Sequence, residues 1–212
     1  MASGPETASL VVENLSVTLG RGEARRRVVH DISFTVSPGK AVGIAGESGS
    51  GKSVTARTLV GLAGDGAAVE AGRLAFGQHD LTRFSKRQWR ALRGKEIGFV
   101  LQDALVSLDP LRAVGDEIAE ALTAHGGWRN RQARQERILE LLKDVGIPEP
   151  ALRARQRPDQ LSGGLRQRAL IATALALSPP ILIADEPTTA LDATVQAQIL
   201  DLLDAIKRRG TG

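Results

Sequence analysis

The sequence predicts an α/β fold with a mostly parallel sheet, and three observations lead to this prediction. Short apolar runs typical of strands alternate along the chain with segments of helical spacing. A glycine-rich stretch, residues 46–53, directly follows one of these runs. A second run, residues 181–184, ends on two acidic side chains. With 212 residues and a hydrophobic content of 42%, the chain is long enough for a substantial core.

The first part of the chain, residues 1–103, is expected to begin with an antiparallel β subdomain. Residues 11–19 and 28–36 alternate between apolar and polar side chains and predict a hairpin-like pair of strands. This pair leads into a buried strand at residues 41–45, and the glycine-rich stretch then opens a helix over residues 52–62. Further short elements are expected at residues 73–76, 86–93 and 97–101.

The pattern then changes to helical spacing, which predicts an inserted helical subdomain over residues 104–158. Its helices are expected at residues 114–123 and 131–145, and Gly146 and Pro148 provide stop signals. The third part, residues 159–212, returns to the core. It is expected to contain a helix, a strand and a helix at residues 163–177, 181–184 and 193–208.

Composition excludes several classes of function. The chain has no cysteine, which rules out disulfides, thiolate zinc sites and iron–sulfur clusters. The net charge is +4, but the basic residues are spread along the chain, so we expect no nucleic-acid partner. The N-terminus lacks a targeting pattern, and the longest apolar stretch is interrupted by Ser178-Pro179-Pro180. We therefore expect a soluble, unsecreted protein that reaches a membrane only through a partner.

The stretch GESGSGKS fits the pattern G-x-x-x-x-G-K-[ST] and lies between a predicted strand and a predicted helix. Glycines allow consecutive backbone N–H groups to surround a phosphate chain. Lys52 can reach the β and γ phosphates, and the Ser53 hydroxyl can ligate Mg²⁺. The alternative is a flexible turn. The predicted nucleotide-binding residues are Gly46, Glu47, Ser48, Gly49, Ser50, Gly51, Lys52, Ser53 and Val54.

An acidic pair at the end of the predicted strand 181–184 supplies the other half of such a site. Asp185 would hold the metal ion, and Glu186 could polarise a water molecule for attack on the γ-phosphate. Taken alone, the pair could equally start a turn before Pro187.

A second phosphate-binding segment is predicted at LSGGLRQR. Ser162 can cap the helix that follows, and Gly163 and Gly164 allow a ligand to approach backbone N–H groups closely. In isolation an ordinary capped helix start is the better interpretation.

The motifs GESGSGKS, LSGGLRQR and ILIADEPTTALD, in this order and spacing, resemble the ATP-binding subunits of ABC transporters, and the resemblance covers essentially the whole chain. The strings RGKEIGFVLQDALVSLDP and PDQLSGGLRQRALIATALALSPPILIADEPTTALDATVQAQIL are similar to the oligopeptide, dipeptide and nickel importer branch. The resemblance implies a P-loop NTPase core with ATP and Mg²⁺ as cofactors. It also implies ATP hydrolysis with Glu186 as the catalytic residue.

The resemblance further implies roles outside the glycine-rich loop. Gln102 would be the lid glutamine that senses the γ-phosphate and magnesium, and residues 103–115 would dock on transmembrane permease subunits. Residues 162–164 would bind the γ-phosphate held by a second ATP-binding subunit in a head-to-tail dimer, and residues 190–192 would connect the two sites. An external solute-binding protein would act indirectly, and the chain would lie at the cytoplasmic side of the cell membrane.

The chain departs from the family pattern at three places. Leu19 stands where an aromatic residue usually stacks on adenine, and it could be either a base contact or a core strand residue. Leu165 replaces a common glutamine, which this branch tolerates. The chain stops at Gly212, before the expected strand and histidine, so we expect a truncated chain that binds Mg-ATP and hydrolyses it poorly.

Three functions compete at this point. The first is an energising subunit in which ATP binding closes the dimer and hydrolysis reopens it. The second is a nucleotide-binding module without turnover, which the missing histidine and Leu19 favour. The third is a soluble ABC ATPase that acts on DNA or ribosomes, which the lack of a long coiled-coil insertion and of tandem cassettes disfavours.

Overall fold

The computed structural model describes residues 9–102 and 104–210. The chain divides into two compact units. One is formed by the residues up to Arg93 together with the end of the chain from Lys207, and the other by Gly94–Ile206. Among the described residues, no helix combines the length and the apolar character that crossing a membrane requires.

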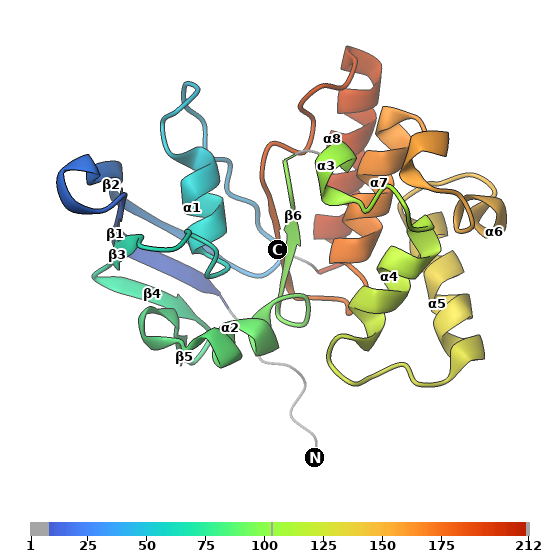
Figure 1. Cartoon of the computed structure of the whole chain (residues 1–212), viewed down its shortest axis with the longest axis horizontal. Coiled ribbons are helices and arrows are strands. Elements are labelled where there is room, and N and C mark those ends of the chain that lie inside the picture. The colour runs from blue at the N-terminus through green and yellow to red at the C-terminus, as the bar shows by residue number, and fades with distance from the viewer. Residues whose placement is uncertain (1–8, 103, 211–212) are drawn as a thin grey trace. The chain divides into compact units, whose positions relative to one another are not determined.

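The first unit is built on a five-stranded antiparallel sheet (Figure 1). Strands β1 (Leu10–Leu19) and β2 (Arg26–Val36) pair along their whole length, from Leu10 opposite Val36 to Leu19 opposite Arg26. The order continues through β4 to β5, and β3 pairs with the end of β1. These three strands are β3 (Ala68–Glu70), β4 (Arg73–Phe76) and β5 (His79–Asp80).

Apolar residues of the sheet and of the turn after β5 form the core of the first unit. They include Leu10, Val12, Leu15, Val17, Leu74, Phe76 and Leu81, each at most 2% exposed. Helix α1 (Lys52–Thr58) packs near β2, and α2 (Lys86–Leu92) begins with a capping box between Ser85 and Gln88. Two short 3-10 turns, η1 (Gly22–Ala24) and η2 (Leu81–Arg83), complete the unit.

The second unit combines a two-stranded parallel sheet with helices. Strand β6 (Ile97–Val100) pairs with β7 (Ile181–Ala184) in register from Ile97 opposite Ile181 to Val100 opposite Ala184. Gly98 in β6 has no room for a side chain, because an added Cβ would lie 2.6 Å from the carbonyl oxygen of Ala174. The sheet and the end of the helix Gly163–Ala174 are therefore in close contact.

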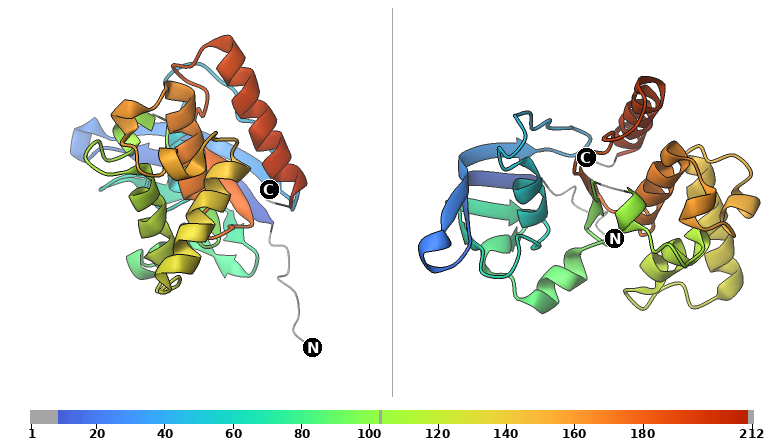
Figure 2. Two further views of the ribbon diagram at one scale, coloured as in Figure 1. Left: turned by 90° about the vertical axis from the view of Figure 1, so that its right-hand side faces the viewer. Right: turned by 45° about the horizontal axis from the view of Figure 1, so that its top comes forward.

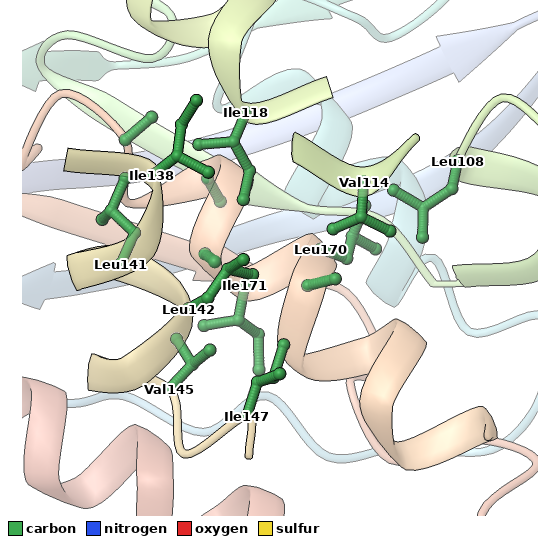
Figure 3. Packing of buried hydrophobic residues seen from close by; sticks show 14 of the residues in the cluster. Leu108, Val114, Ile118, Ile138, Leu141, Leu142, Val145, Ile147, Leu170 and Ile171 are labelled. Carbon is green, nitrogen blue, oxygen red and sulfur yellow. The ribbon is translucent and has the colours of Figure 1, made fainter. Parts of the chain in front are cut away.

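Six of the described helices belong mainly to this unit. Among them, α4, α5 and α7 pack against one another, and both views of Figure 2 show them side by side. Side chains such as Ile118, Leu142 and Ile171 meet in its centre and are fully buried (Figure 3). The helices are α3 (Ala104–Ser107), α4 (Val114–Thr123), α5 (Arg131–Asp144), α6 (Pro150–Arg153), α7 (Gly163–Ala174) and α8 (Ala193–Arg208), with a 3-10 turn η3 (Pro158–Gln160) before α7.

The predicted buried strand at residues 41–45 is wrong. These residues form no strand, and the side chains of Val42 and Ile44 are 43% and 44% exposed. An apolar run is fixed as a strand only when a neighbour pairs with its backbone, and no described strand pairs with this one. Parallel pairing within the described residues is therefore confined to β6 and β7, and the larger sheet is antiparallel.

Several boundaries also differ from the prediction. Helix α1 ends at Thr58, not at Leu62, and Gly61 follows with a φ of +68°. A Cβ at Gly61 would lie 2.4 Å from the ring of Trp89, so the chain turns where α2 packs against it. The short elements β3, β5, α3 and α6 were not predicted from the sequence pattern.

Candidate functional site

The glycine-rich loop forms a tight turn directly before α1. Gly49 and Gly51 have φ angles of +79° and +93°, in the left-handed region that favours glycine. Gly51 is required on steric grounds as well, because an added Cβ would lie 2.4 Å from the carbonyl oxygen of Val28. At Gly46 an added Cβ would lie 2.6 Å from the hydroxyl of Ser50, which is a side-chain atom and can rotate away. The backbone of the loop therefore explains Gly51, whereas it does not require a glycine at position 46.

Lys52 folds back over the loop. Its ammonium group donates to the carbonyl oxygens of Gly46 and Glu47, each at 2.8 Å. The loop from Gly46 to Ser50, with Ser48 and Gly49, is exposed, whereas Ser53 and Val54 are half-buried in the first turn of α1. The loop therefore presents exposed backbone beside a fixed positive charge, which is the chemistry that binds phosphate.

Leu19 is the last residue of β1 and pairs with Arg26. Its side chain is half-buried. This intermediate exposure is compatible with both interpretations given to Leu19, a base contact and a core strand residue, and a role at adenine stays a prediction.

In the second unit the acidic pair follows β7. The backbone N–H of Asp185 donates to the carbonyl oxygen of Val100 at 3.0 Å, and the Asp185 side chain is buried. Glu186 has a φ of +47°, which is uncommon for a residue other than glycine. Pro187 follows it and disfavours the right-handed helical region for Glu186.

The structure brings Gln102 and Glu186 together, although 84 positions separate them. The amide Nε2 of Gln102 donates to Oε2 of Glu186 at 2.8 Å. The hydroxyl of Thr189 donates to the same oxygen at 3.0 Å. The sequence motifs do not identify Thr189 as a partner of Glu186. The turn residues Pro187 and Thr188 between them were the available signal, because a four-residue turn brings its ends together.

The segment LSGGLRQR contains the start of α7, which begins at Gly163 as predicted. The Ser162 hydroxyl caps the helix by accepting from the N–H of Leu165 at 3.4 Å. Ser162 and Gly163 are exposed, whereas Gly164 packs against α8, with only 2.7 Å between an added Cβ and Val195. Gly163 faces Leu191 at an ordinary 3.4 Å. The exposed part of the motif is therefore accessible to another molecule.

The predicted docking segment, residues 103–115, is anchored at two points and exposed between them. Asp103 lies outside the described residues. Leu108 and Val114 are buried in the helical core. Between them, Leu111 is 78% exposed, and Asp109 holds the loop by accepting from the N–H of Leu111 at 2.9 Å.

A cavity of about 550 Å³ lies in the first unit, away from the motifs. Trp89, Leu74 and Leu81 supply apolar lining, and Lys86, Arg90 and Arg93 supply positive charge. Burial, together with the nearby charge of Arg90, lowers the pKa of the Arg93 guanidinium. Arg93 also donates to the carbonyl oxygen of Val60 at 3.1 Å, which orders this wall of the cavity.

The predicted residues fit a magnesium nucleotide by their chemistry. Ser53, Gln102 and Asp185 offer a hydroxyl, an amide and a carboxylate, and such oxygen ligands are those that Mg²⁺ prefers. The backbone at Gly51 leaves no space for a side chain, as a loop that approaches phosphate closely requires. Ser53 belongs to the first unit, whereas Gln102 and Asp185 belong to the second.

Comparisons with known proteins show a similarity that covers most of the chain. The family model described as "ABC transporter" matches residues 29–189. The dipeptide transport ATP-binding protein of Escherichia coli is 47% identical over 202 residues, which are 95% of this chain and 62% of that protein. The protein of the same name from Bacillus subtilis is 45% identical over 201 residues, 94% of this chain and 60% of that one. The chain thus spans about three fifths of the length of these relatives.

Solved structures show the same fold. One is a dimeric ATP-binding cassette in a post-hydrolysis state with ADP and Pi bound. It is 30% identical, has a TM-score of 0.79, and the match covers 94% of this chain and 83% of that one. A cassette from a Clostridium perfringens transporter complex has a TM-score of 0.76 at 26% identity, covering 94% of this chain and 74% of that one. The predicted fold class is confirmed by these similarities.

Proposed function

Because this chain belongs to the ABC transporter family, we propose that it is an ATP-binding and ATP-hydrolysing subunit that energises transport through ATP-driven dimer closure. One observation carries the catalytic part of the proposal. Gln102, which follows β6, and Glu186, which follows β7, share a hydrogen bond of 2.8 Å at the ends of two parallel strands. In open α/β sheets, ligands bind at the carboxyl ends of the strands.

The solute is proposed to be a peptide or a nickel-type solute, taken up rather than exported. Relatives named for dipeptide transport support this choice at 43 to 47% identity. In this proposal an external binding protein and the permease select the solute. The cassette would supply only the energy, and its proposed site accordingly consists of phosphate-binding residues.

Each residue of the proposed site has a defined task. Mg²⁺, held by Ser53, Asp185 and Gln102, would neutralise charge on the phosphoryl oxygens. The backbone of residues 46–51 and the ammonium group of Lys52 hold the phosphate chain in place. Glu186 accepts a proton from the attacking water. Gln102 orients Glu186 through the hydrogen bond between them.

The partners follow from the same family assignment. A second ATP-binding subunit, identical or paralogous, would complete the site with its residues 162–164, of which Ser162 and Gly163 are exposed. Transmembrane permease subunits would bind the exposed loop around Leu111. The cavity beside Trp89 adds a basic and apolar surface that suits an acidic amphipathic segment of such a permease. The chain would then work at the cytoplasmic side of the membrane, and no nucleic acid takes part.

The test measures Mg-ATP binding and phosphate release by this chain beside the variants Glu186→Gln and Lys52→Ala. We expect the chain to bind ATP and release phosphate, and Glu186→Gln to bind ATP equally well but to release phosphate at least about 10²-fold more slowly. Lys52→Ala should weaken binding itself.

Two other results have clear meanings. If the chain and Glu186→Gln bind ATP and both fail to release phosphate, the chain is a nucleotide-binding module without turnover. If the chain binds no ATP, or if Glu186→Gln hydrolyses ATP at the normal rate, the proposal is overturned. Robust hydrolysis that depends on Glu186 would support the proposal, and it would contradict the separate expectation, made from the sequence, that turnover is poor.

A further inference from the structure

We propose that Thr189 is a positioning residue that holds the carboxylate of Glu186 in its working orientation. The inference rests on the proposed function, because it assigns Glu186 the role of proton acceptor. Two donors reach the same oxygen of this carboxylate, Gln102 from one loop and Thr189 from another. A carboxylate held from two directions has fewer rotamers available than one held from a single direction.

The backbone gives independent support. Residues 186–189 form a four-residue turn in which the N–H of Thr189 donates to the carbonyl oxygen of Glu186 at 3.2 Å. Pro187 occupies the second position of this turn, where its fixed φ is favoured. The side-chain bond from Thr189 to Glu186 spans the same turn a second time. The backbone carbonyl of Glu186 and its side-chain carboxylate are therefore both held by Thr189.

The conformation of Glu186 indicates that this arrangement is a constrained one. Its φ of +47° lies in the left-handed region, which a residue with a Cβ adopts at a cost. Residues in such conformations persist when the surrounding contacts determine them, and they gather at functional sites. The Thr189 hydroxyl is such a contact, because it ties the Glu186 side chain to the turn.

Thr189 and Gln102 differ in one respect that assigns them different tasks. Gln102 lies in the loop after β6, and its amide oxygen is also a proposed ligand of Mg²⁺. Thr189 belongs to the turn after β7 itself, three residues from Glu186. The contact from Thr189 thus lies within a local turn and does not depend on the position of the loop that carries Gln102.

Kinetics of ATP hydrolysis test the proposal with three variants. Thr189→Val keeps the shape of the side chain and removes the hydroxyl, and we expect it to lower kcat about tenfold or more, because the lost bond is one to a charged group. The KM for ATP should not change, since Thr189 does not belong to the phosphate-binding loop. Thr189→Ser restores the donor and should recover most of the activity.

Thr188→Val is the matched control, because it makes the same change at the neighbouring residue of the same turn. It should leave kcat unchanged. The proposal is overturned if Thr189→Val hydrolyses ATP at the normal rate, or if Thr189→Ser is as slow as Thr189→Val. It is also overturned if Thr188→Val and Thr189→Val are equally slow.

A second measurement decides the question independently of turnover. Thr189→Val is introduced into the original chain and into Glu186→Ala, and the urea midpoint of unfolding is measured for all four proteins. We expect Thr189→Val to lower the midpoint in the original chain and to have little effect in the Glu186→Ala background. Equal shifts in both backgrounds would exclude the interaction. If the chain releases no phosphate, the catalytic part of the proposed function fails, while this cycle still tests the contact.

Discussion

Gly49 and Gly51 of the phosphate-binding loop are both required by the structure of the chain, but for different reasons. Gly49 and Gly51 both have positive φ angles, yet they differ in the space around them. An added Cβ at Gly49 meets nothing within 4 Å, whereas at Gly51 it would collide with the carbonyl oxygen of Val28. Gly51 is therefore fixed by its neighbour in β2, and Gly49 by its backbone conformation alone.

This difference leads to a prediction for two alanine variants. Gly49→Ala should lower the free energy of unfolding by about 1 kcal/mol, the cost of placing a Cβ at positive φ. Gly51→Ala should cost clearly more and should weaken ATP binding further, because the loop must shift away from Val28. Thermal unfolding and ATP titration of both variants provide the measurement. Equal losses of stability at the two positions would show that the contact with Val28 has no energetic effect.

At the scale of elements, motifs and long periodic segments could be predicted from the sequence, whereas pairing could not. The bounds of β4, β7, α4 and α8 agree with the prediction because each has a strong local pattern. Residues 41–45 have an equally strong apolar pattern, but no described strand pairs with them. A strand needs a partner from elsewhere in space, and local sequence does not encode whether one is present.

In the candidate site, too, the local motifs could be predicted from the sequence, whereas the contacts between distant residues could not. The glycine-rich loop, the acidic pair and the helix cap at Ser162 were predictable, because each is a local motif with a mechanical reason. The contact between Gln102 and Glu186 spans 84 positions and depends on the parallel pairing of β6 and β7. The contact between Thr189 and Glu186 depends on the orientation of a side chain within a turn. The first contact is visible only in three dimensions, and for the second the only sequence signal is the turn formed by Pro187 and Thr188.

The loop between α3 and α4 is the element on which we expect a permease to dock, and Leu111 is its most exposed apolar residue. We expect Leu111→Asp to lower the fraction of the chain recovered with membranes from cells that contain its permease, because a charge would replace an apolar contact. ATP binding by the isolated chain should not change, since Leu111 is 78% exposed and its replacement disturbs no core.

The matched control for this prediction is Leu152→Asp in α6. Leu152 is also exposed, at 48%, and lies outside the predicted docking segment. Membrane recovery should stay normal for this variant. A similar loss for both variants would mean that general surface hydrophobicity, not the loop around Leu111, determines association with the membrane.

At the scale of the whole molecule, the proposed active form is a dimer in which residues 162–164 of one subunit contact the nucleotide of the other. Gly163 and Gly164 differ in their surroundings, so that substitutions at the two positions can separate an effect on folding from an effect on dimer assembly. Gly164 packs closely against Val195, so a side chain there would disturb the subunit itself. Gly163 is exposed and has ordinary space around it, so a side chain there should leave the fold intact.

Gly163→Asp should therefore prevent dimer formation without loss of stability. Gly163 is the first residue of α7, where a carboxylate interacts favourably with the helix dipole, so the thermal midpoint should stay equal or rise slightly. The same charge would repel the γ-phosphate of the partner's nucleotide.

Size-exclusion chromatography with ATP measures dimer formation in the Glu186→Gln background, which should trap ATP. The parent should elute as a dimer and Gly163→Asp as a monomer. Gln132→Asp, in the first turn of α5, places an equal charge at another helix start and should dimerise normally. Normal dimerisation of Gly163→Asp would contradict a shared site, whereas a loss in both variants would attribute the effect to net charge.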